Sequence, residues 1–282
     1  MTDLFYDLST HAGVLTHARA CLSGKRVVLS LSGGQDSTTC LYLAREAGAE
    51  VHALTVHYGQ RHALEIGAAK RVAAMADACS HELLHLTNIL KGTSPLVSTS
   101  PLEQYAGHQH LPGGIEKTFV PMRNAFFLTL AANRAVVLKA DYIIVGVSEE
   151  DYGGYPDCRE AFLGSAEAMI GEALGESVES YPRIYAPLLH LNKCETVRLA
   201  KELPGCLYAT ESMKAAGLSY GAMAYTHTAY DGQYPPTGHD HATLLRAKGF
   251  EEAGEPDPLV LRAHAEGLMP LPNTLNYASQ GA

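Results

Sequence analysis

The feature that most restricts the fold of this chain is a short apolar segment that runs straight into a glycine pair and then into a helical segment. Val27–Leu31 is apolar apart from one serine, Ser32–Ser37 reads Ser-Gly-Gly-Gln-Asp-Ser, and Thr38–Ala44 has helical character. Glycine adopts positive φ without steric cost, so Gly33 and Gly34 let backbone N–H groups face an anion. The start of the following helix adds partial positive charge. The order strand, glycine turn and helix therefore predicts a phosphate-binding loop.

The same alternation of strand and helix continues along the chain. Runs rich in apolar and β-branched residues predict five strands, at Arg26–Ser32, Val51–His57, Glu82–Leu86, Tyr142–Val147 and Ile184–Leu189. Stretches of helical period at Ala63–Ala78 and Ala125–Lys139 lie between them. Strands that alternate with helices favour parallel pairing through crossover connections. We therefore predict an α/β fold, with a doubly wound, mainly parallel, five-stranded sheet of Rossmann-like type.

The carboxy-terminal part of the sequence has a different character. After Pro204 glycine, tyrosine, histidine and proline dominate, and only Ala242–Lys248 has a short helical pattern. We predict a main domain at residues 1–203 and a small irregular or helical appendage at 204–282. Within the main domain, the polar stretch Asn88–Lys117 is long for a loop, which is typical of a functional or mobile segment.

Charge and composition restrict the partners. The formal net charge is −9, which gives no overall support for gripping a nucleic-acid backbone, so a small molecule is the better substrate class. The six cysteines are scattered without a Cys-x-x-Cys pair, as is typical of reduced, buried thiols. No apolar run approaches the roughly 20 residues of a membrane span, and Met1–Leu22 lacks the pattern of a secretory signal. We expect a cytoplasmic protein without membrane contact.

The polar side chains of the predicted phosphate loop have distinct expected roles. The hydroxyls of Ser32 and Ser37 can donate to phosphate oxygens. A carboxylate beside phosphates needs a cation between them, so Asp36 acts either through Mg²⁺ or as a brace of the loop. The alternative for the whole segment is an ordinary strand-to-helix turn with a serine or aspartate cap. The complete Ser-Gly-Gly-x-Asp-Ser string favours phosphate binding, and it differs from the Walker loop, which ends in Gly-Lys-Ser/Thr.

Three further polar strings lie where open α/β sheets bind ligands, beyond the carboxyl ends of predicted strands or at a helix start. They are His57-Tyr58-Gly59-Gln60-Arg61-His62, Thr118-Phe119-Val120-Pro121-Met122-Arg123-Asn124 and Asp151-Tyr152-Gly153-Gly154-Tyr155-Pro156-Asp157-Cys158-Arg159. The planar guanidinium groups of Arg123 and Arg159 suit a carboxylate or an α-phosphate. These strings therefore predict a second ligand group beside the phosphate loop.

The remaining polar side chains of these strings suit a flat heterocycle. Asp151 or Asp157 can accept hydrogen bonds from a guanine-like edge. Tyr152 or Tyr155 can stack on the ring. Taken singly, Arg123 has the alternative of a surface salt bridge and Tyr155 that of a packed core aromatic. Their clustering beside the phosphate loop favours the binding interpretation.

The phosphate loop resembles the PP-motif of N-type ATP pyrophosphatases, and all four strings together resemble the QueC family, from about Arg26 to Lys201. The family strings are Tyr-Gly-Gln-Arg, Phe-Val-Pro-Gly-Arg-Asn and Asp-Tyr-Ser-Gly-Tyr-Pro-Asp-Cys-Arg. The resemblance implies a ligase of queuosine biosynthesis in which ATP adenylates the carboxylate of 7-carboxy-7-deazaguanine. Ammonia then displaces AMP, giving first the amide and then the nitrile 7-cyano-7-deazaguanine, preQ0. The resemblance also implies Mg²⁺ as a cofactor and a homodimer.

The resemblance also assigns roles to residues. The segment Asn192–Thr196 is similar to the family's Asp-Lys-x-Glu-Thr, although Lys193 by residue type could equally cap a helix. The expected catalytic residues are Asp36, Arg123 and Lys193. The expected ATP-binding residues are Ser30, Ser32, Gly33, Gly34, Gln35, Asp36, Ser37, Tyr58, Gln60 and Arg61. The expected substrate-binding residues are Phe119, Arg123, Asn124, Asp151, Tyr152, Tyr155, Pro156, Asp157 and Arg159. Cys158 is best interpreted as a small buried thiol.

The appendage departs from the family, which has four zinc-binding cysteines there. The matching segments are Thr226–Gly232 and Thr237–Arg246. The four cysteine positions hold Ala229, Thr237, Asp240 and Thr243. Because alanine and threonine are not zinc ligands of normal affinity, we expect no metal and no structural zinc. The alternative is a substitute zinc site of His227, His239, His241 and Asp231 or Asp240, but His239 and His241 are two residues apart and point to opposite faces of an extended backbone. We therefore expect the segment to be held by hydrogen bonding and packing, with these histidines facing solvent.

Three functional hypotheses follow. The first is nitrile or amide synthesis on 7-carboxy-7-deazaguanine with ammonia. The second is a repurposed ligase that joins the activated deazaguanine to another amine, on a protein or a nucleic acid, because Met122 and Gly153 replace a family glycine and serine inside the substrate strings. The third is a nucleotide-binding module without turnover, against which the complete Ser32–Ser37 string argues.

Overall fold

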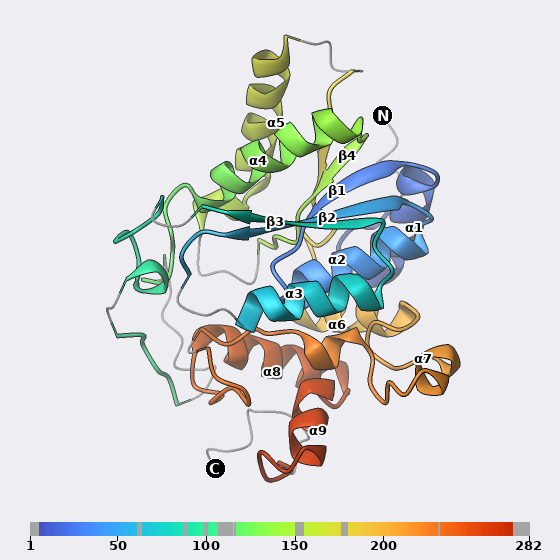
Figure 1. The fold of residues 1–282 in the computed structure, drawn as a ribbon, viewed down its shortest axis with the longest axis vertical. Coiled ribbons are helices and arrows are strands. Elements are labelled where there is room, and N and C mark those ends of the chain that lie inside the picture. The colour runs from blue at the N-terminus through green and yellow to red at the C-terminus, as the bar shows by residue number, and fades with distance from the viewer. Residues whose placement is uncertain are drawn as a thin grey trace.

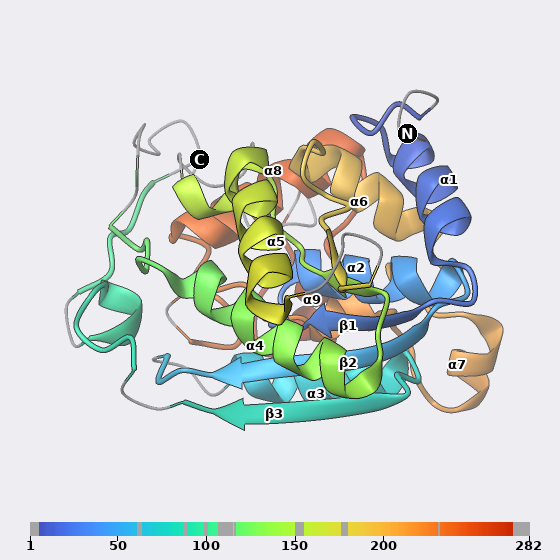
Figure 2. The same ribbon diagram turned by 90° about the horizontal axis from the view of Figure 1, so that it is seen from above.

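The computed structural model describes residues 6–60, 64–86, 89–98, 101–106, 115, 117–149, 155–175, 180–230 and 232–272. At its centre lies a parallel sheet of β1 (Arg26–Ser30), β2 (Glu50–His57), β3 (Ser80–His85), β4 (Tyr142–Ile144) and β5 (Arg183–Tyr185). The strands follow the order β3-β2-β1-β4-β5, so the order reverses between β1 and β4 (Figure 1, Figure 2). Each predicted strand is found, which confirms the α/β fold. The strands β4 and β5 both end earlier than predicted, because buried apolar residues continue beyond the ladder at Val145 and at Leu188 and Leu189.

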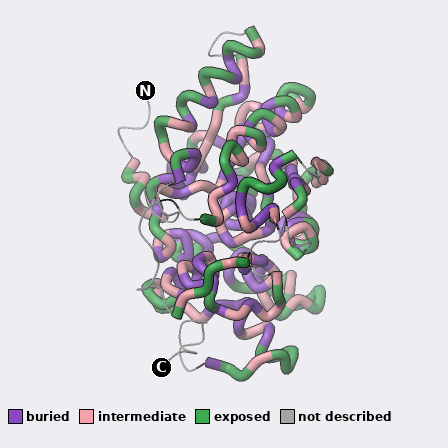
Figure 3. Tube along the Cα trace, turned by 90° about the vertical axis from the view of Figure 1, so that its left-hand side faces the viewer, coloured by how far each residue is buried: buried purple, intermediate pink, exposed green. Residues whose placement is uncertain are grey.

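Helices cover both faces of the sheet (Figure 1). One face carries α1 (His11–Leu22), α2 (Gln35–Glu46), α3 (Leu64–Met75) and α6 (Lys193–Glu202). The other face carries α4 (Arg123–Leu138) and α5 (Glu160–Leu174). Figure 3 shows that buried segments lie between these layers and that exposed residues lie on their outer sides. Within the described residues, no helix has the length and apolarity that crossing a membrane requires.

The central strand β1 is buried on both sides. Val27 and Leu29 join the hydrophobic cluster under α1, α2 and α6, whereas Val28 joins the cluster under α4 and α5. Alternate residues of a strand point to opposite faces of the sheet. A parallel strand that helices cover on both faces therefore has a continuous apolar sequence. This is why the segment before the glycine pair could be recognised from the sequence.

The appendage packs beneath the layer that contains α2 and α6 (Figure 1). It includes α7 (Glu211–Ala215), α8 (His241–Ala253) and α9 (Pro258–Ala265). Leu203, Cys206 and Phe250 belong to one hydrophobic cluster, so the core continues across the predicted boundary at residue 204. The division into residues 1–203 and 204–282 stays a prediction about folding units. The helical pattern at 242–248 is found as the longer α8, whereas no range had been predicted for α1, α5, α6, α7 or α9.

A buried ion pair lies at the centre of the appendage. Arg246 is 1% exposed and Asp257 is 0% exposed. The guanidinium Nε and Nη2 atoms donate to the two carboxylate oxygens at 2.6 and 2.8 Å. Arg246 also donates to the Thr226 hydroxyl at 2.8 Å and to the Met223 carbonyl at 3.1 Å. The Leu259 N–H donates to Asp257 at 2.9 Å, at the start of α9. The pair therefore joins three segments of the appendage.

The Arg246→Met substitution is expected to lower the free energy of unfolding by about 3–5 kcal/mol, because it leaves the Asp257 carboxylate buried without its counter-charge. The Arg246→Met/Asp257→Asn double variant removes that charge and keeps an oxygen to cap α9, so it should recover much of the loss. Urea unfolding of both variants measures the effect. Arg198→Met, which breaks an exposed ion pair with Glu195, is the control. A loss below about 1 kcal/mol in Arg246→Met would contradict the prediction.

Candidate active site

A cavity of about 210 Å³ lies at the carboxyl ends of β1 and its neighbours β2 and β4. Open α/β sheets bind ligands at this edge, where the strand order reverses. The first residues of four helices line the cavity: Gln35 of α2, Arg123 of α4, Lys193 of α6 and His241 of α8. A helix start carries partial positive charge, and the start of α2 also has no side-chain cap. The cavity is therefore suited to an anionic ligand.

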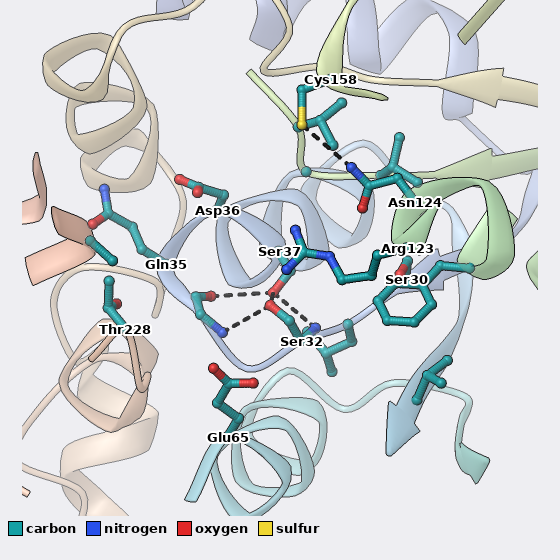
Figure 4. Close-up of a pocket in the computed structure, with 18 of the residues that line it drawn as sticks. Ser30, Ser32, Gln35, Asp36, Ser37, Glu65, Arg123, Asn124, Cys158 and Thr228 are labelled. Atoms are coloured by element: carbon teal, nitrogen blue, oxygen red, sulfur yellow. Dashed lines mark hydrogen bonds between the residues drawn. The ribbon is translucent and has the colours of Figure 1, made fainter. Parts of the chain in front are cut away.

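The glycine loop forms the floor of the cavity. Gly33 has φ of 86°, and a Cβ atom there would lie 2.5 Å from the carbonyl oxygen of Glu65 and 2.6 Å from the Ala69 nitrogen. The position therefore requires glycine for its conformation and for the close approach of α3. The Ser32 hydroxyl lies 3.0 Å from the Ser37 hydroxyl and accepts from the Gly34 N–H at 3.2 Å (Figure 4). The start of α2 has no side-chain cap, which leaves its first N–H groups to a ligand.

Asp36 and Lys193 form a largely buried ion pair in the cavity wall. The Lys193 Nζ donates to both carboxylate oxygens of Asp36 at 2.9 Å. Asn192 caps α6, because its side chain accepts from the Glu195 N–H at 2.8 Å. Sequence analysis left open whether Lys193 acts on the phosphates or caps a helix, and the structure shows that Asn192 is the cap. The Lys193 side chain instead brings a positive charge to the phosphate loop.

Arg123 lies inside the cavity, and its guanidinium points toward Ser37 (Figure 4). Burial raises the pKa of Glu65 to about 7, although the Arg123 charge opposes that shift. Burial also raises the pKa of Asp157, again against the Arg123 charge. Burial raises the pKa of Tyr58, which Arg123 opposes by its charge and a hydrogen bond. Arg123 is therefore a cavity residue with two acidic neighbours, and the alternative of a surface salt bridge is wrong.

The residue before Arg123 explains a departure from the family string. Met122 has φ of 65°, in the left-handed region, and precedes the first residue of α4. Glycine adopts this conformation without the cost that a side chain imposes. The family glycine therefore suits the backbone at this position. The Met122 side chain is exposed and does not line the cavity, so its replacement of glycine does not alter the cavity wall directly.

Asn124, Asp157 and Cys158 form one group in the cavity wall. The Asn124 backbone N–H donates to Asp157 at 3.3 Å, and its side-chain amide donates to the Asp157 carbonyl at 3.1 Å and the Cys158 sulfur at 3.4 Å. Burial raises the pKa of the Cys158 thiol to about 12, and the nearby Asp157 carboxylate adds to the shift. Cys158 is thus a buried, protonated thiol, as the sequence interpretation held.

The residues expected to bind ATP are largely brought together. Those that line the cavity are Ser30, Ser32, Gly34, Gln35, Asp36, Ser37, Tyr58 and Gln60. Gln60 accepts from the Tyr58 N–H at 2.9 Å and so stabilises the turn after β2. Gly33 lies in the loop itself, against α3. Arg61, which was also expected to bind ATP, lies outside the described residues.

The residues expected to bind the second substrate are brought together only in part. Arg123, Asn124 and Asp157 line the cavity, whereas Phe119, Tyr155, Pro156 and Arg159 are not among its lining residues. Tyr155 is buried, packs on Phe119 at 5.1 Å between ring centroids and shares a 2.7 Å hydrogen bond with Thr118. Tyr155 is therefore a packed core aromatic and not a ring that faces the cavity. Arg159 donates to the Glu149 carbonyl at 2.8 Å. Asp151 and Tyr152 lie outside the described residues.

The appendage contributes cavity residues that sequence analysis missed. His227, Thr228 and His241 line the cavity, and both histidines are buried. The expectation that His227 and His241 face solvent is therefore wrong, whereas His239 is exposed as expected. Glu65 of α3 was missed as well. Glu65 lies three residues after the string His57–His62, so its position could have been noticed in the sequence. The appendage residues had no such local signal, because they reach the cavity only through packing of segments that are distant in the sequence.

Three of the four positions that hold zinc ligands in the family, Ala229, Asp240 and Thr243, have a role in packing or helix capping. Ala229 is buried, and Asp240 caps α8 by accepting from the Thr243 N–H at 3.0 Å. The Thr243 hydroxyl donates to the Asp240 carbonyl, also at 3.0 Å. Within the described part of the chain, no group of three or more histidine, cysteine or acidic side chains is placed to hold a metal ion. A helix cap is therefore present where the family has metal ligands.

The pKa of Glu65 predicts a pH-dependent stability. In the unfolded chain the carboxyl has its ordinary pKa of 4.5, whereas in the folded protein the pKa is about 7. Protonated Glu65 therefore stabilises the folded state fully below about pH 4.5, and this stabilisation is lost as the pH rises to about 7. The stability of the wild type relative to Glu65→Gln should fall between about pH 5 and pH 8. Urea unfolding across this range measures the difference, and a constant difference would refute the prediction. Glu46→Gln, at a surface ion pair, is the control.

Comparison with known proteins places this site in context. Residues 26–254 match the family described as queuosine biosynthesis protein QueC. A 7-cyano-7-deazaguanine synthase of Gloeobacter violaceus is 45% identical over 235 residues, which are 83% of this chain and 95% of that protein. The synthase of Chromobacterium violaceum is 42% identical over 248 residues, covering 86% and 97%, and that of Laribacter hongkongensis is 40% identical over 241 residues, covering 84% and 95%. The match extends past Lys201 and includes the segments Thr226–Gly232 and Thr237–Arg246, where the family cysteines are replaced, and the whole of α8.

Proposed function

This chain belongs to the QueC family, and from that membership we propose that it is an ATP-dependent ligase that converts 7-carboxy-7-deazaguanine with ammonia to 7-cyano-7-deazaguanine. The observation that most supports this function is that the glycine loop before α2 and the guanidinium of Arg123 face each other in one cavity. The loop suits phosphates and the guanidinium suits a carboxylate. The two groups that must react are thereby held together.

In the proposed reaction the carboxyl carbon of the substrate is activated twice, first in the carboxylate and then in the amide. The substrate carboxylate attacks the α-phosphorus of ATP, and pyrophosphate leaves. Ammonia then attacks the acyl adenylate, AMP leaves with the carboxyl oxygen, and the amide forms. The amide oxygen then attacks the α-phosphorus of a second ATP, pyrophosphate and one amide proton leave, and elimination of AMP with the other amide proton gives the nitrile. The protein mainly positions the reactants and excludes water from the adenylate.

We assign roles in this reaction to side chains that line the cavity. The hydroxyls of Ser32 and Ser37 and the first N–H groups of α2 bind pyrophosphate oxygens. Asp36 fits Mg²⁺, because its carboxylate lies in the cavity wall next to the loop, and the cation would offset the charge of the phosphates. Lys193 adds positive charge at the same end, and Arg123 orients the carboxylate. Burial raises the pKa of Glu65 to about 7, so at neutral pH Glu65 carries less negative charge near the carboxylate than an ordinary acid would.

A product assay tests the proposed function. The protein is incubated with ATP, Mg²⁺ and 7-carboxy-7-deazaguanine, with and without ammonia, and the products are weighed by mass spectrometry. We expect the nitrile only with ammonia, with two AMP released per nitrile. A product that carries another amine would instead support the repurposed ligase. Absence of AMP release would support a nucleotide-binding module without turnover.

Two expectations about the protein in the cell complete the proposal. We propose that the chain forms a homodimer and that it acts in the cytoplasm, where ATP and ammonia are available. Light scattering of the purified protein measures its mass in solution. A mass of one chain across the working concentration range would exclude the dimer.

We also predict that the purified protein contains no structural zinc. Ala229, Thr237 and Thr243 replace three cysteine ligands of the family, and Asp240 already accepts the Thr243 N–H as the cap of α8. Metal analysis of protein purified without a polyhistidine tag should find far less than one zinc per chain after dialysis. The same analysis on a relative with the four cysteines is the control. About one tightly bound zinc per chain would overturn the prediction.

A further inference from the structure

Three acidic side chains line the cavity within the described residues, and the protein engages the carboxylates of two of them. Asp36 has both oxygens bound by Lys193, and Asp157 accepts from the Asn124 N–H at 3.3 Å. The third acid is Glu65. The described part of the chain makes neither a hydrogen bond nor an ion pair to its carboxylate. A polar group without such a partner in a binding cavity calls for an explanation.

Close packing fixes the position of Glu65. It lies at the start of α3, and its backbone carbonyl is so near the glycine loop that a Cβ atom on Gly33 would be 2.5 Å from it. The Gly33 carbonyl in turn accepts from the His227 N–H at 2.9 Å. Figure 4 shows the Glu65 carboxylate pointing from α3 toward the loop, on the side of Ser32. The carboxylate therefore faces the space in which the reactants meet.

The elements packed against α3 bring few charges toward Glu65. Tyr58 follows β2, η5 (Ala222–Tyr225) has one titratable residue, a tyrosine, and α2 presents Asp36. The Arg123 charge, from α4, opposes the rise that burial causes in the pKa of Glu65, and Arg123 also hydrogen-bonds to Tyr58. Within the described residues, Arg123 is therefore the positively charged side chain that acts on Glu65.

Binding of the substrate leaves the Glu65 charge without compensation. Under the proposed function the substrate carboxylate occupies Arg123, which then no longer offsets a second acid. Lys193 is held by Asp36. Asp240, the buried acid at the start of α8, caps that helix and does not line the cavity. A small cation beside Glu65 would balance the remaining negative charge.

The proposed reaction supplies such a cation. At neutral pH dissolved ammonia is mostly ammonium, whose nitrogen has no lone pair and cannot attack the acyl adenylate. A base near the carboxyl carbon must therefore remove a proton. Burial raises the pKa of Glu65 to about 7, so at neutral pH a good part of the carboxylate is ionised and can accept that proton. Proton transfer from ammonium to a carboxylate removes two charges, which a partly buried site favours.

Other titratable groups of the cavity are less suited to this task. Burial raises the pKa of the Cys158 thiol to about 12, so the thiol is already protonated. His227 and His241 line the cavity from the appendage. Thr228, which follows His227, lies across the cavity from Arg123 in Figure 4. Because the Arg123 charge acts on the acid of α3, that acid is the better placed base for a carboxyl group bound to Arg123.

Resting on the proposed function, we infer that Glu65 binds the ammonium ion and takes one of its protons. The ammonia so formed attacks the carboxyl carbon of the acyl adenylate, and a carbon–nitrogen bond forms. The bond from that carbon to the AMP oxygen then breaks, AMP leaves, and the nitrogen releases its second proton to water. Glu65 returns its proton to solvent before the next turnover.

Glu65→Gln tests the inference by separating adenylation from nitrogen transfer. Exchange of labelled pyrophosphate into ATP, with 7-carboxy-7-deazaguanine and without ammonia, measures adenylation and should stay within about threefold of the wild type. In contrast, kcat/KM for ammonium should fall about 100-fold, as is usual when a general base is lost. Hydroxylamine is largely uncharged at neutral pH and needs no base to free its lone pair, so hydroxamate formation should stay within about threefold.

The pH dependence gives a second measurement. In the wild type kcat/KM for total ammonium should level off above about pH 7 and fall below it, because protonated Glu65 cannot take a proton. In Glu65→Gln the reaction depends on ammonia from solution, so kcat/KM should keep rising, about tenfold per pH unit, through this range. Glu65→Asp keeps a carboxylate and should retain more activity than Glu65→Gln. Glu46→Gln, at a surface ion pair, is the control and should behave as the wild type.

Three results would overturn the inference. One is an unchanged kcat/KM for ammonium in Glu65→Gln. Another is an equal loss of pyrophosphate exchange, hydroxamate and amide, which would place Glu65 in adenylation, as a Mg²⁺ ligand would be. The third is a pH profile of the variant that runs parallel to that of the wild type.

Failure of the proposed function gives a different result. It would appear as the absence of pyrophosphate exchange in the wild type. Ammonium binding alone then tests the site, because a ligand that binds the folded state raises Tm. At about pH 8 and constant ionic strength, ammonium chloride should raise the Tm of the wild type above its value in sodium chloride, but not that of Glu65→Gln. Equal Tm values of the wild type in the two salts would then overturn the ammonium site.

Discussion

Replacing Asp36 with asparagine is expected to lower AMP formation from ATP and 7-carboxy-7-deazaguanine at least about a thousandfold, or roughly 4 kcal/mol of transition-state stabilisation. The substitution keeps the shape of the side chain but removes the charge that Lys193 contacts through both carboxylate oxygens. It also removes the carboxylate that fits Mg²⁺. Single-turnover assays of AMP release measure the chemical step without the contribution of product release.

The pair with Lys193 allows a sharper test of the same prediction. If Asp36 and Lys193 act as a unit, Lys193→Met should also lose most activity, and the double variant should be little worse than either single variant. Glu46→Gln, which breaks an exposed ion pair with Arg19, is the control and should keep wild-type activity. Wild-type turnover by a folded Asp36→Asn protein would remove Asp36 from the phosphate chemistry.

Arg123→Ala should lower kcat/KM for 7-carboxy-7-deazaguanine about 100-fold to 1000-fold, or roughly 3–4 kcal/mol. Arg123 starts α4, lines the cavity and points toward the glycine loop (Figure 4). Its loss also leaves Glu65 and Asp157 without their nearby positive charge, which raises their pKa values further. Steady-state kinetics at fixed saturating ATP and ammonia measure the effect.

Two further variants test whether the activity depends on the planar guanidinium of Arg123, on its charge alone or on α4 in general. Arg123→Lys keeps the charge but loses the planar pair of donors, so it should recover only part of the activity. Arg134→Ala lies on the same helix, at an ion pair with Glu82 outside the cavity, and should keep wild-type kinetics. A kcat/KM of Arg123→Ala within about twofold of the wild type would show that Arg123 binds neither reactant.

Much of the scaffold could be predicted because its signals are local. The apolar run Val27–Leu29 predicted a strand since helices cover β1 on both faces. Gly33 could be assigned to a tight turn from residue type alone. The structure adds that α3 approaches too closely for any side chain at this position.

Some local signals were present in the sequence but were not used. α9 starts at Pro258, and the side chain of Asp257 accepts from the Leu259 N–H, which is a standard helix start. α1 follows Thr10, whose hydroxyl accepts from the Gly13 N–H. Both helix starts could therefore have been predicted from the sequence.

The sequence by itself determined the α/β fold, the phosphate loop and the family, because strand and helix period and contiguous strings depend on residues near one another in the chain. Only the tertiary structure decided which side chains share the cavity. Lys193 contacts Asp36 across 157 positions, and Thr228 and His241 reach the cavity through packing of the appendage. Contacts with Phe119 and Thr118 hold Tyr155 buried and away from the cavity. The direction of a side chain depends on the segments packed against it, and no local pattern of residues records those segments.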